Sequence, residues 1–283
     1  MLENLIFFFL SSEISKNFEK KSEPVFLEME VSSIEDKINQ DTEEDFNKFW
    51  KSWVVYDLKS WAILWWKNQD DQLAMASLTK LMSVLIILEN HDLDEEVELD
   101  SEAVFYWWSS LDVRVWEVFT VWDLVKWALV KSWNNAIIAL AKHDSWSVDK
   151  FVEKMNIRWS ELWLKNTKFQ NPTWFDDDWH YSSAKDLAIL SKYIYQYDFV
   201  KNTVSQKKWT IYSKFWRKVD FYTTNRLLSS EVVWLKTWTT PDAGQCLITI
   251  IKKDWKELLF VLLGSEDRFF ETKKLIEFVF EKI

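Results

Sequence analysis

The segment VVWLKTWTTPDAGQCLITIIKKDWKELLFVLLGS, residues 232–265, decides the fold. It contains three apolar runs of strand length, and Asp254 and Trp255 join the second run to the third. An aspartate followed by a glycine is the usual pair in a two-residue hairpin turn, because both turn residues need a positive φ. The segment therefore predicts neighbouring antiparallel strands with a turn at residues 254–255, but it places a tryptophan where glycine is expected.

The composition has one abnormal feature, which is the balance between tryptophan and glycine. The 283 residues include 21 Trp and 2 Gly, whereas a chain of this length ordinarily contains about 20 glycines. Several tryptophans stand in turn contexts, where glycine is expected because it adopts positive φ without a steric penalty; examples are Trp61, Trp146, Trp174 and Trp255. We interpret most of the tryptophans as glycines whose codons were translated with the wrong genetic code. The codon UGA encodes glycine in some bacterial lineages and tryptophan in others. UGG codons at Trp61, Trp238 and Trp255 would contradict this interpretation.

The net charge and the rare residues exclude several classes of function. A formal net charge of −10 argues against a nucleic-acid surface, because phosphate binding needs clustered Lys and Arg. The single cysteine, Cys246, excludes an internal disulfide, and its apolar surroundings predict a buried side chain. The three histidines, His91, His143 and His180, show no ligand spacing, so the sequence predicts neither a metal site nor a cofactor.

The polarity of the sequence divides the chain into a polar amino-terminal part, residues 1–48, and one domain, residues 49–283. The apolar run Leu5–Leu10 has no Lys or Arg before it, which predicts either a degraded export signal or a buried strand. Residues 11–48 are rich in Glu, Lys, Ser and Asn and have the composition of a linker. The sequence contains no run of about 20 apolar residues, the length that an ordinary membrane-spanning helix needs.

Within the domain, strand patterns near both ends enclose a helical block. Strands are predicted within 54–68 and 232–265, and an extended segment at 98–105. Amphipathic or apolar patterns predict helices at 77–90, 120–132, 134–143, 147–162, 182–197 and 269–283. This order predicts an α/β (α+β) fold, with a mostly antiparallel sheet flanked by helices and a largely helical subdomain inserted at about 80–225. The last helix is expected to pack against the sheet and not to anchor in a membrane.

The first motif that carries chemistry is Ser77-Leu78-Thr79-Lys80. Residues three apart share one face of a helix, so the amine of Lys80 is within reach of Ser77 Oγ. A serine hydroxyl needs an adjacent base before it acts as a nucleophile. Lysine serves as that base only if burial or a nearby cation lowers its pKa from the ordinary value of about 10.4. Alone the motif is weak, because Ser-x-x-Lys is frequent by chance.

The second motif is Ser132-Trp133-Asn134, at the junction of two predicted helices. A hydroxyl and an amide two residues apart on a tight turn point into one cleft, where they can relay a proton and hold a substrate amide. A glycine at position 133 would make this turn easy, and a tryptophan is expected to make it awkward.

The third motif is Lys236-Thr237-Trp238-Thr239, on a strand that we place at the edge of the sheet. Lys236 and Thr237 are suited to bind a carboxylate. A glycine at position 238 would let an extended substrate pair with the strand backbone. The backbone N–H of Thr239 can then join that of Ser77 in an oxyanion hole.

In this order the three motifs form the set S-x-x-K, S-x-N and K-T-G. With them, the chain resembles the serine-type D-alanyl-D-alanine carboxypeptidases, the low-molecular-mass penicillin-binding proteins with a β-lactamase/transpeptidase-like fold. The resemblance extends from about Trp53 to the carboxyl end and includes ASLTKLM, LVKSWNNAIIALA, FQNPTWFDDDWHYSSAKDLA, TNRLL and WLKTWTTPDAGQCL. The family has glycine where this sequence has tryptophan, most tellingly at 133, 174, 179, 234 and 238.

The resemblance implies a role for each motif residue. Ser77 would attack the carbonyl between two D-alanines of a peptidoglycan stem peptide, and Lys80 would accept its proton. Ser132 and Asn134 would relay the proton and position the peptide amide. The third motif would hold the terminal carboxylate, through Lys236, Thr237, Trp238 and Thr239. The resemblance implies no cofactor, and it implies that β-lactams acylate Ser77. The protein is expected to be a monomer on the outer face of the cytoplasmic membrane or in the cell wall. If Trp238 is real, it blocks the cleft.

Other functions stay open at this point. A D,D-endopeptidase on the same scaffold would cut cross-links in place of free tails. A class A β-lactamase needs a glutamate that activates the deacylating water, and the loop after the second motif offers Asp176, Asp177 and Asp178 in its place. The non-catalytic alternatives are a penicillin sensor and a glycan-binding module lined with genuine tryptophans.

Overall fold

The computed structural model describes residues 49–106 and 109–283. The predicted export signal and linker, residues 1–48, lie outside the described residues. The division at residue 48 and the subdomain limits of about 80 and 225 stay predictions.

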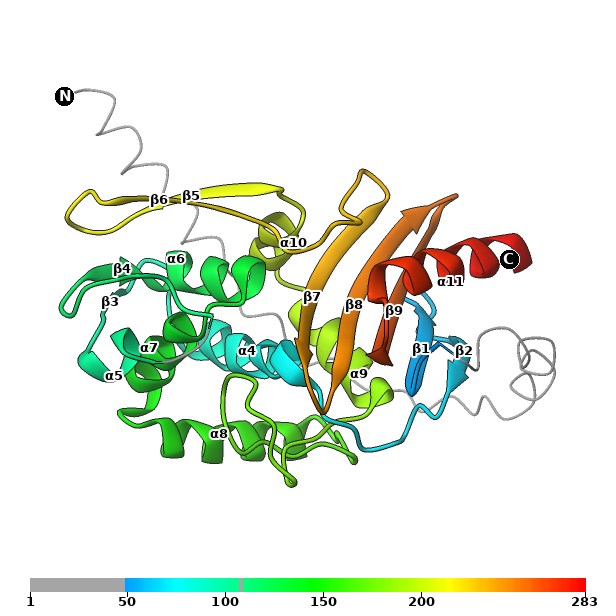
Figure 1. Ribbon diagram of the computed structural model, residues 1–283, viewed down its shortest axis with the longest axis horizontal. Coiled ribbons are helices and arrows are strands. Elements are labelled where there is room, and N and C mark those ends of the chain that lie inside the picture. The colour runs from blue at the N-terminus through cyan, green and yellow to red at the C-terminus, as the bar shows by residue number, and fades with distance from the viewer. Residues whose placement is uncertain (1–48, 107–108) are drawn as a thin grey trace.

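A five-stranded antiparallel sheet forms one side of the molecule (Figure 1). Its strands lie in the order β2-β1-β9-β8-β7, with the bounds β1 Ser52–Asp57, β2 Ile63–Lys67, β7 Val232–Thr240, β8 Gly244–Lys253 and β9 Lys256–Ser265. The central strand β9 pairs with β1 on one side and β8 on the other, so the sheet joins both ends of the described chain. The strand β7 occupies an edge, as the sequence predicts.

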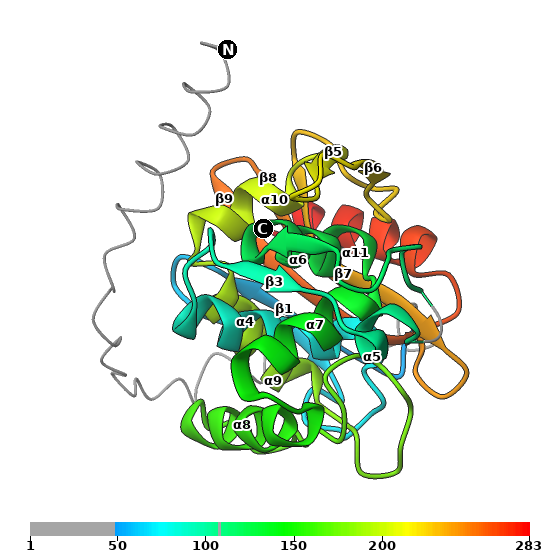
Figure 2. The same ribbon diagram turned by 90° about the vertical axis from the view of Figure 1, so that its left-hand side faces the viewer.

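Helices surround this sheet and fill the other side of the molecule (Figure 2). They are α4 Lys80–Asn90, α5 Ser101–Val104, α6 Val121–Lys126, α7 Asn134–Ser145, α8 Val148–Glu161, α9 Ala184–Ile194, α10 Asp198–Val204 and α11 Arg268–Lys282. A 3-10 turn, η2 (Ala76–Thr79), precedes α4, and a π-helical turn, η3 (Trp127–Lys131), continues α6. The helices α9 and α11 cover opposite faces of the sheet (Figure 1).

Two small two-stranded sheets complete the described structure. The strand β3 (Glu96–Glu98) pairs with β4 (Val118–Thr120), and β5 (Lys208–Tyr212) pairs with β6 (Lys218–Tyr222). The expectation of one extended segment at 98–105 is wrong beyond residue 98, because Asp100 caps the short helix α5 by accepting a hydrogen bond from the Ala103 N–H. Among the described helices, none is long and apolar enough to cross a membrane.

Side-chain caps and apolar faces explain where the main helices begin and what they cover. Thr120 accepts a hydrogen bond from the backbone N–H of Asp123, and Ser183 accepts one from that of Asp186. Such caps stabilise a helix by about 1 kcal/mol each. The helix α11 buries Leu275 and Val279 against the sheet, which confirms the expected packing.

The turn between β8 and β9 confirms the predicted hairpin. Lys253 pairs with Lys256, and the two residues between them, Asp254 and Trp255, have φ values of 49° and 67°. Positive φ at both central positions defines the type I′ turn, which strongly favours glycine at its second position. The Trp255 side chain is 94% exposed, so its indole gains little from packing.

Left-handed backbone recurs at tryptophans through the described chain. Six of them have a positive φ: Trp61, Trp116, Trp146, Trp163, Trp216 and Trp255. Both glycines, Gly244 and Gly264, have a positive φ as well. A bulky residue with positive φ is an outlier, because its Cβ crowds the backbone. The turn predictions at Trp61 and Trp146 are thus confirmed in conformation, whereas Trp174 does not have a positive φ.

Candidate active site

The first motif lies at the start of α4, where the 3-10 turn η2 leads into the helix. In a 3-10 turn the side chains at positions i and i+3 eclipse each other. Lys80 Nζ accordingly donates a hydrogen bond of 2.8 Å to Ser77 Oγ. Both residues are fully buried, and Ala76, directly before the serine, has a φ of 50°. The turn therefore presents the serine and the amine to each other, at some backbone strain.

The second motif lies between η3 and α7, and its Ser132 reaches the same amine. Lys80 Nζ lies 3.4 Å from Ser132 Oγ. The expectation that residue 133 carries the difficult conformation is wrong, because Trp133 is extended, with a φ of −70° and a ψ of 131°. Ser132 itself is left-handed, with a φ of 64°. Strained residues of this kind gather at functional sites, where the surrounding structure holds them.

Asn134, the third residue of this motif, is the buried first residue of α7. Its backbone N–H donates to the carbonyl of Ser109 over 2.8 Å, and the Ser109 hydroxyl donates to the carbonyl of Ser132 over 3.3 Å. The segment around Ser109 therefore fixes the turn that carries the motif.

The third motif lies on the edge strand β7, which packs against η2. The pairing of β7 with β8 is irregular between Trp234 and Lys236, and such a bulge re-aims the side chains that follow it. Lys236 and Thr237 are buried, and Lys236 Nζ donates to the backbone carbonyl of Thr237 over 3.0 Å. Thr239, by contrast, is exposed and accepts a hydrogen bond from Arg268. Arg268 also donates to the carbonyl of Trp238, so α11 holds the outer side of the strand.

Two buried amines set the electrostatics of the site. Burial holds the pKa of Lys80 well below its ordinary value, and the positive charge of Lys236 lowers this pKa further. Burial, followed by the charge of Arg268, lowers the pKa of Lys236 in the same way. The lowered pKa favours the neutral amine, which is the form of Lys80 that can accept a proton from the hydroxyl of Ser77.

With tryptophan at position 238, the indole closes the site. The Nζ atoms of Lys80 and Lys236 each lie 5.8 Å from the centroid of its ring. Ser77 has no exposed surface, so no substrate reaches its hydroxyl in this conformation. A residue without a side chain at position 238 would leave this volume to a ligand.

A buried histidine, His180, supports the turn that carries Ser77. The sequence alone does not reveal this contact. His180 Nε2 lies 2.8 Å from Thr79 Oγ1, and the Thr79 hydroxyl donates to the carbonyl of Ala76 over 2.7 Å. The backbone N–H of Gln170 donates to His180 Nδ1, so the ring proton is on Nε2. Burial lowers the pKa of His180 to about 4, which keeps the ring neutral. The contact spans 101 residues of sequence, a separation that no local pattern detects.

A cavity of about 320 Å³ lies at the end of β7, beside the aspartates of the loop after α8. Its lining includes Asp176, Asp177, Asp178 and Asp242, and Ser77 is not among its lining residues. Asp176 accepts a hydrogen bond of 2.8 Å from the hydroxyl of Thr240. Asp176 therefore ties the loop to the end of β7, directly after the third motif.

Two of the three histidines come together in space, although their spacing along the sequence does not indicate it. His91 and His143 lie side by side, with ring centroids 4.8 Å apart, and both contact Glu95. Tertiary packing brings together the carboxyl ends of α4 and α7, and a search for spacing along the sequence misses such a contact.

Comparison with known proteins agrees with this geometry. A family model described as D-alanyl-D-alanine carboxypeptidase, peptidase S11, matches residues 39–267. The D-alanyl-D-alanine carboxypeptidase DacF of Bacillus subtilis (strain 168) is 31% identical over 242 residues, which cover 82% of this chain and 62% of that protein. The chain thus spans about three fifths of the length of the curated relatives it matches.

Two solved structures show the same fold. The Streptomyces K15 DD-transpeptidase superposes with a TM-score of 0.78 at 23% identity, covering 82% of this chain and 97% of that one. Penicillin-binding protein D2 of Listeria monocytogenes, in its ampicillin-bound form, superposes with a TM-score of 0.69 at 28% identity, covering 81% of this chain and 96% of that one. On the family match and the 31% identity, this chain belongs to the D-alanyl-D-alanine carboxypeptidase family, peptidase S11.

Proposed function

We propose that the protein is a serine-type D-Ala-D-Ala carboxypeptidase, which removes the terminal D-alanine of peptidoglycan stem peptides. The observation that carries the proposal is the hydrogen bond of 2.8 Å between Lys80 Nζ and Ser77 Oγ, in a site that Ser132 shares. A nucleophile and a base at this distance are the requirement for acyl transfer. The substrate lies outside the cytoplasmic membrane, so the active protein is an exported one, and we expect a monomer.

The reaction has two halves in this proposal. Ser77 Oγ attacks the carbonyl carbon between the two D-alanines, and its proton passes to Lys80 Nζ. Ser132 relays this proton to the nitrogen of the departing D-alanine, while Asn134 holds the peptide amide. Water then attacks the ester on Ser77, and the same amine takes a proton from the water. The amine returns this proton to Ser77 Oγ as the ester bond breaks and the shortened peptide leaves.

The edge strand β7 binds the substrate in this scheme. Lys236 and Thr237 hold the terminal carboxylate, since a buried cation and a hydroxyl form strong hydrogen bonds with it. The N–H groups of Ser77 and Thr239 stabilise the negative oxygen of the tetrahedral intermediate. The backbone at position 238 pairs with the extended peptide, which requires glycine there.

We propose further that the active protein carries glycine at position 238 and at most of the other tryptophan positions. The six left-handed tryptophans support this proposal, because positive φ is ordinary for glycine and strained for a bulky side chain. The codons of the gene, together with mass spectrometry of peptides from the native protein, test it. UGA codons and glycine masses are expected; tryptophan masses would overturn it.

Labelling with a fluorescent penicillin tests the enzymatic proposal. The glycine form of the chain is expected to bind the label covalently, and Ser77→Ala is expected to abolish labelling. A folded glycine form without any label would contradict the proposal. Release of D-alanine from a pentapeptide then separates the carboxypeptidase from an endopeptidase, which would cleave cross-linked dimers. Rapid turnover of the penicillin would identify a β-lactamase, and labelling without release of D-alanine would identify a penicillin sensor.

A further inference from the structure

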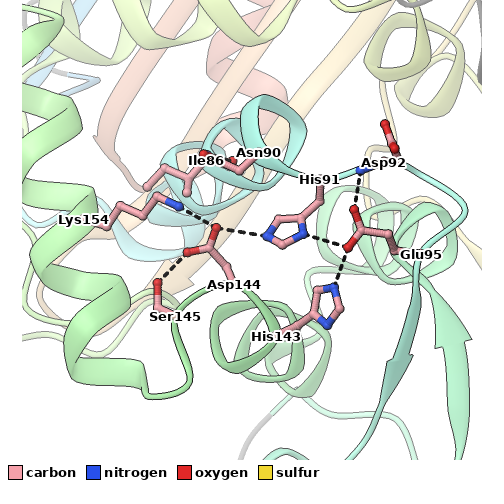
Figure 3. A network of polar contacts seen from close by, with 9 residues as sticks. All are labelled: Ile86, Asn90, His91, Asp92, Glu95, His143, Asp144, Ser145 and Lys154. Carbon is pink, nitrogen blue, oxygen red and sulfur yellow. Dashed lines mark hydrogen bonds and ion pairs between the residues drawn. The ribbon is translucent and has the colours of Figure 1, made fainter.

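A cluster of polar side chains lies at the far ends of the two helices that carry the first and second motifs (Figure 3). Glu95 Oε2 lies 2.9 Å from His91 Nδ1 and 2.9 Å from His143 Nε2. These three side-chain atoms all lie within 4.8 Å of one another. His91 directly follows α4, His143 belongs to the last turn of α7, and Glu95 lies just before β3. Three separate elements thus direct one donor atom each to a common point.

The two ring nitrogens of His91 make contacts that a bound cation would explain. Its second nitrogen, Nε2, lies 3.1 Å from Asp144 Oδ1, so both ring nitrogens face a carboxylate. A neutral imidazole has one N–H and one lone pair. In a neutral ring, one of the two nitrogens therefore directs its lone pair at a carboxylate oxygen, and the two repel each other. A cation between the nitrogen and the oxygen would remove this repulsion. A second proton removes this conflict, and so does a metal ion bound to the lone pair.

The surroundings of His91 favour the metal ion. Metal-binding histidines usually donate their other N–H to a carboxylate, which fixes the tautomer and aims the lone pair at the ion. Asp144 is placed for this role, because its side chain is 1% exposed. Lys154 and Ser145 donate to the same carboxylate and hold it in position. The N–H of His91 on Nε2 then leaves Nδ1 directed at Glu95 and His143.

The donors and their exposure match a particular class of ion. Two imidazoles and one carboxylate suit zinc and related divalent transition metals. The Glu95 side chain is 38% exposed and that of His143 is 25% exposed, so an ion can enter and water can complete its shell. The backbone N–H of Asp92 donates to Glu95 Oε1 over 2.7 Å, which leaves Oε2 as the oxygen that faces the histidines.

We propose that His91, Glu95 and His143 bind one divalent transition-metal ion of the zinc class, with Asp144 as the carboxylate that orients His91. The ion joins the carboxyl end of α4 to that of α7. Lys80 begins α4 and Asn134 begins α7, so the ion fastens both helices at the ends remote from the catalytic groups. The site is structural and stabilises the helical part of the molecule, and it is independent of the chemistry at Ser77.

Titration of the metal-free chain with Zn²⁺, without a histidine tag, tests this proposal. One equivalent is expected to bind and to raise the melting temperature, because a ligand that binds only the folded state stabilises it. Glu95→Gln and His143→Gln each remove a donor and are expected to abolish the stoichiometric binding. Asp144→Asn is expected to weaken it by roughly 10- to 100-fold, as for other residues that orient a metal ligand.

Asp94→Asn is the matched control for Glu95→Gln. It removes the same charge from the same loop, and Asp94 is exposed and has no donor atom in the cluster. It is expected to leave Zn²⁺ binding unchanged. Equal binding by Glu95→Gln and Asp94→Asn, or no stoichiometric binding by the unaltered chain, would overturn the proposal.

Binding of Co²⁺ to the unaltered chain gives a test that needs no folded variant. NMR spectra are expected to contain two paramagnetically shifted imidazole N–H signals, one each from His91 and His143, and none from His180. Shifted signals from His180, or none from the other two rings, would contradict the assignment.

Discussion

At the scale of single residues, the most unusual feature is the burial of two lysines in one site. Lys80 and Lys236 are both fully buried, although lysine almost never is without a paired carboxylate. Burial disfavours their charged forms and so lowers both pKa values. A chain selected only for stability would not retain such a pair. A lowered pKa favours the neutral form of Lys80, the form that the proposed mechanism requires of its base.

Replacement of Trp238 by glycine is expected to open the site. The indole of Trp238 lies near the amines of Lys80 and Lys236, and Ser77 is inaccessible. We therefore expect Trp238→Gly to raise covalent labelling by a fluorescent penicillin from background to about one label per chain. Trp255→Gly is the control, because that residue lies in the β8–β9 turn, and it should leave labelling at background. Equal labelling of the two variants would show that Trp238 is not the obstruction.

The charge of Lys236 is expected to set the pH dependence of acylation in the chain with glycine at position 238. In the proposed mechanism Lys80 acts as a neutral amine, so the rate should rise as the pH increases through its pKa. Lys236→Met removes a neighbouring positive charge and thus raises the pKa of Lys80, which moves this rise to higher pH. It also removes a charged contact to the carboxylate and should slow acylation by about 10- to 100-fold.

Lys236→Arg separates these two effects. It keeps the positive charge, so the midpoint of the pH profile should stay in place even where the rate falls. The measurement is the second-order rate constant of acylation by a penicillin as a function of pH. A midpoint that moves equally in both variants would mean that the charge of Lys236 does not act on Lys80.

At the scale of elements, the β8–β9 hairpin joins a favourable strand pattern to an unfavourable turn residue. A left-handed conformation costs a bulky residue roughly 1–2 kcal/mol, and the exposed Trp255 has no packing to offset it. Trp255→Gly is therefore expected to raise the free energy of unfolding by roughly 1–2 kcal/mol, measured by urea denaturation.

Trp179→Gly provides the comparison for this hairpin variant. Trp179 is also exposed, at 61%, but it does not have a positive φ. Its replacement is expected to change stability by no more than about 0.5 kcal/mol, the usual range for a surface position. A gain in stability of the same size at both positions would remove the conformational argument.

Local sequence patterns predicted the elements whose causes are themselves local. The helices predicted at 120–132 and 182–197 and the Asp254–Trp255 turn each depend on residues within a few positions of one another. The β5–β6 hairpin was missed, although its strands are local. The left-handed Ser132 was missed because its conformation is held by Ser109, in a distant segment.

The candidate site was predictable in its members and not in its geometry. The first two motifs supply Ser77, Lys80 and Ser132, and the structure brings their side chains within hydrogen-bonding distance. The support from His180 and the cluster around Glu95 depend on contacts across 101 and 48 residues. Periodicity and caps carry no information about such contacts.

At the scale of the whole molecule, the candidate site joins two parts of the structure. The nucleophile and the second motif belong to the helical part, and Lys236 belongs to the sheet. A covalently bound penicillin in the glycine form would contact both parts and is expected to raise the melting temperature. For a domain of this size, each kcal/mol of added stability corresponds to roughly 2–4 °C.

Ser77→Ala is the control for this thermal shift, because it cannot be acylated and should show no shift at the same penicillin concentration. Differential scanning calorimetry measures both proteins. A shift of equal size in Ser77→Ala would mean that binding without acylation is sufficient.

The position of β9 in the centre of the sheet has a consequence for biosynthesis. Ser52 pairs with Leu263, so β1 and β2 lack their partner strand β9 until residues 256–265 have left the ribosome. Contacts of such long sequence separation also form slowly. The nascent chain therefore stays without its sheet while translation proceeds, which is the condition in which a polypeptide can be threaded through a secretion channel. Lys236 therefore joins Ser77 and Lys80 only afterwards, and under the export proposed above this happens on the outer side of the membrane.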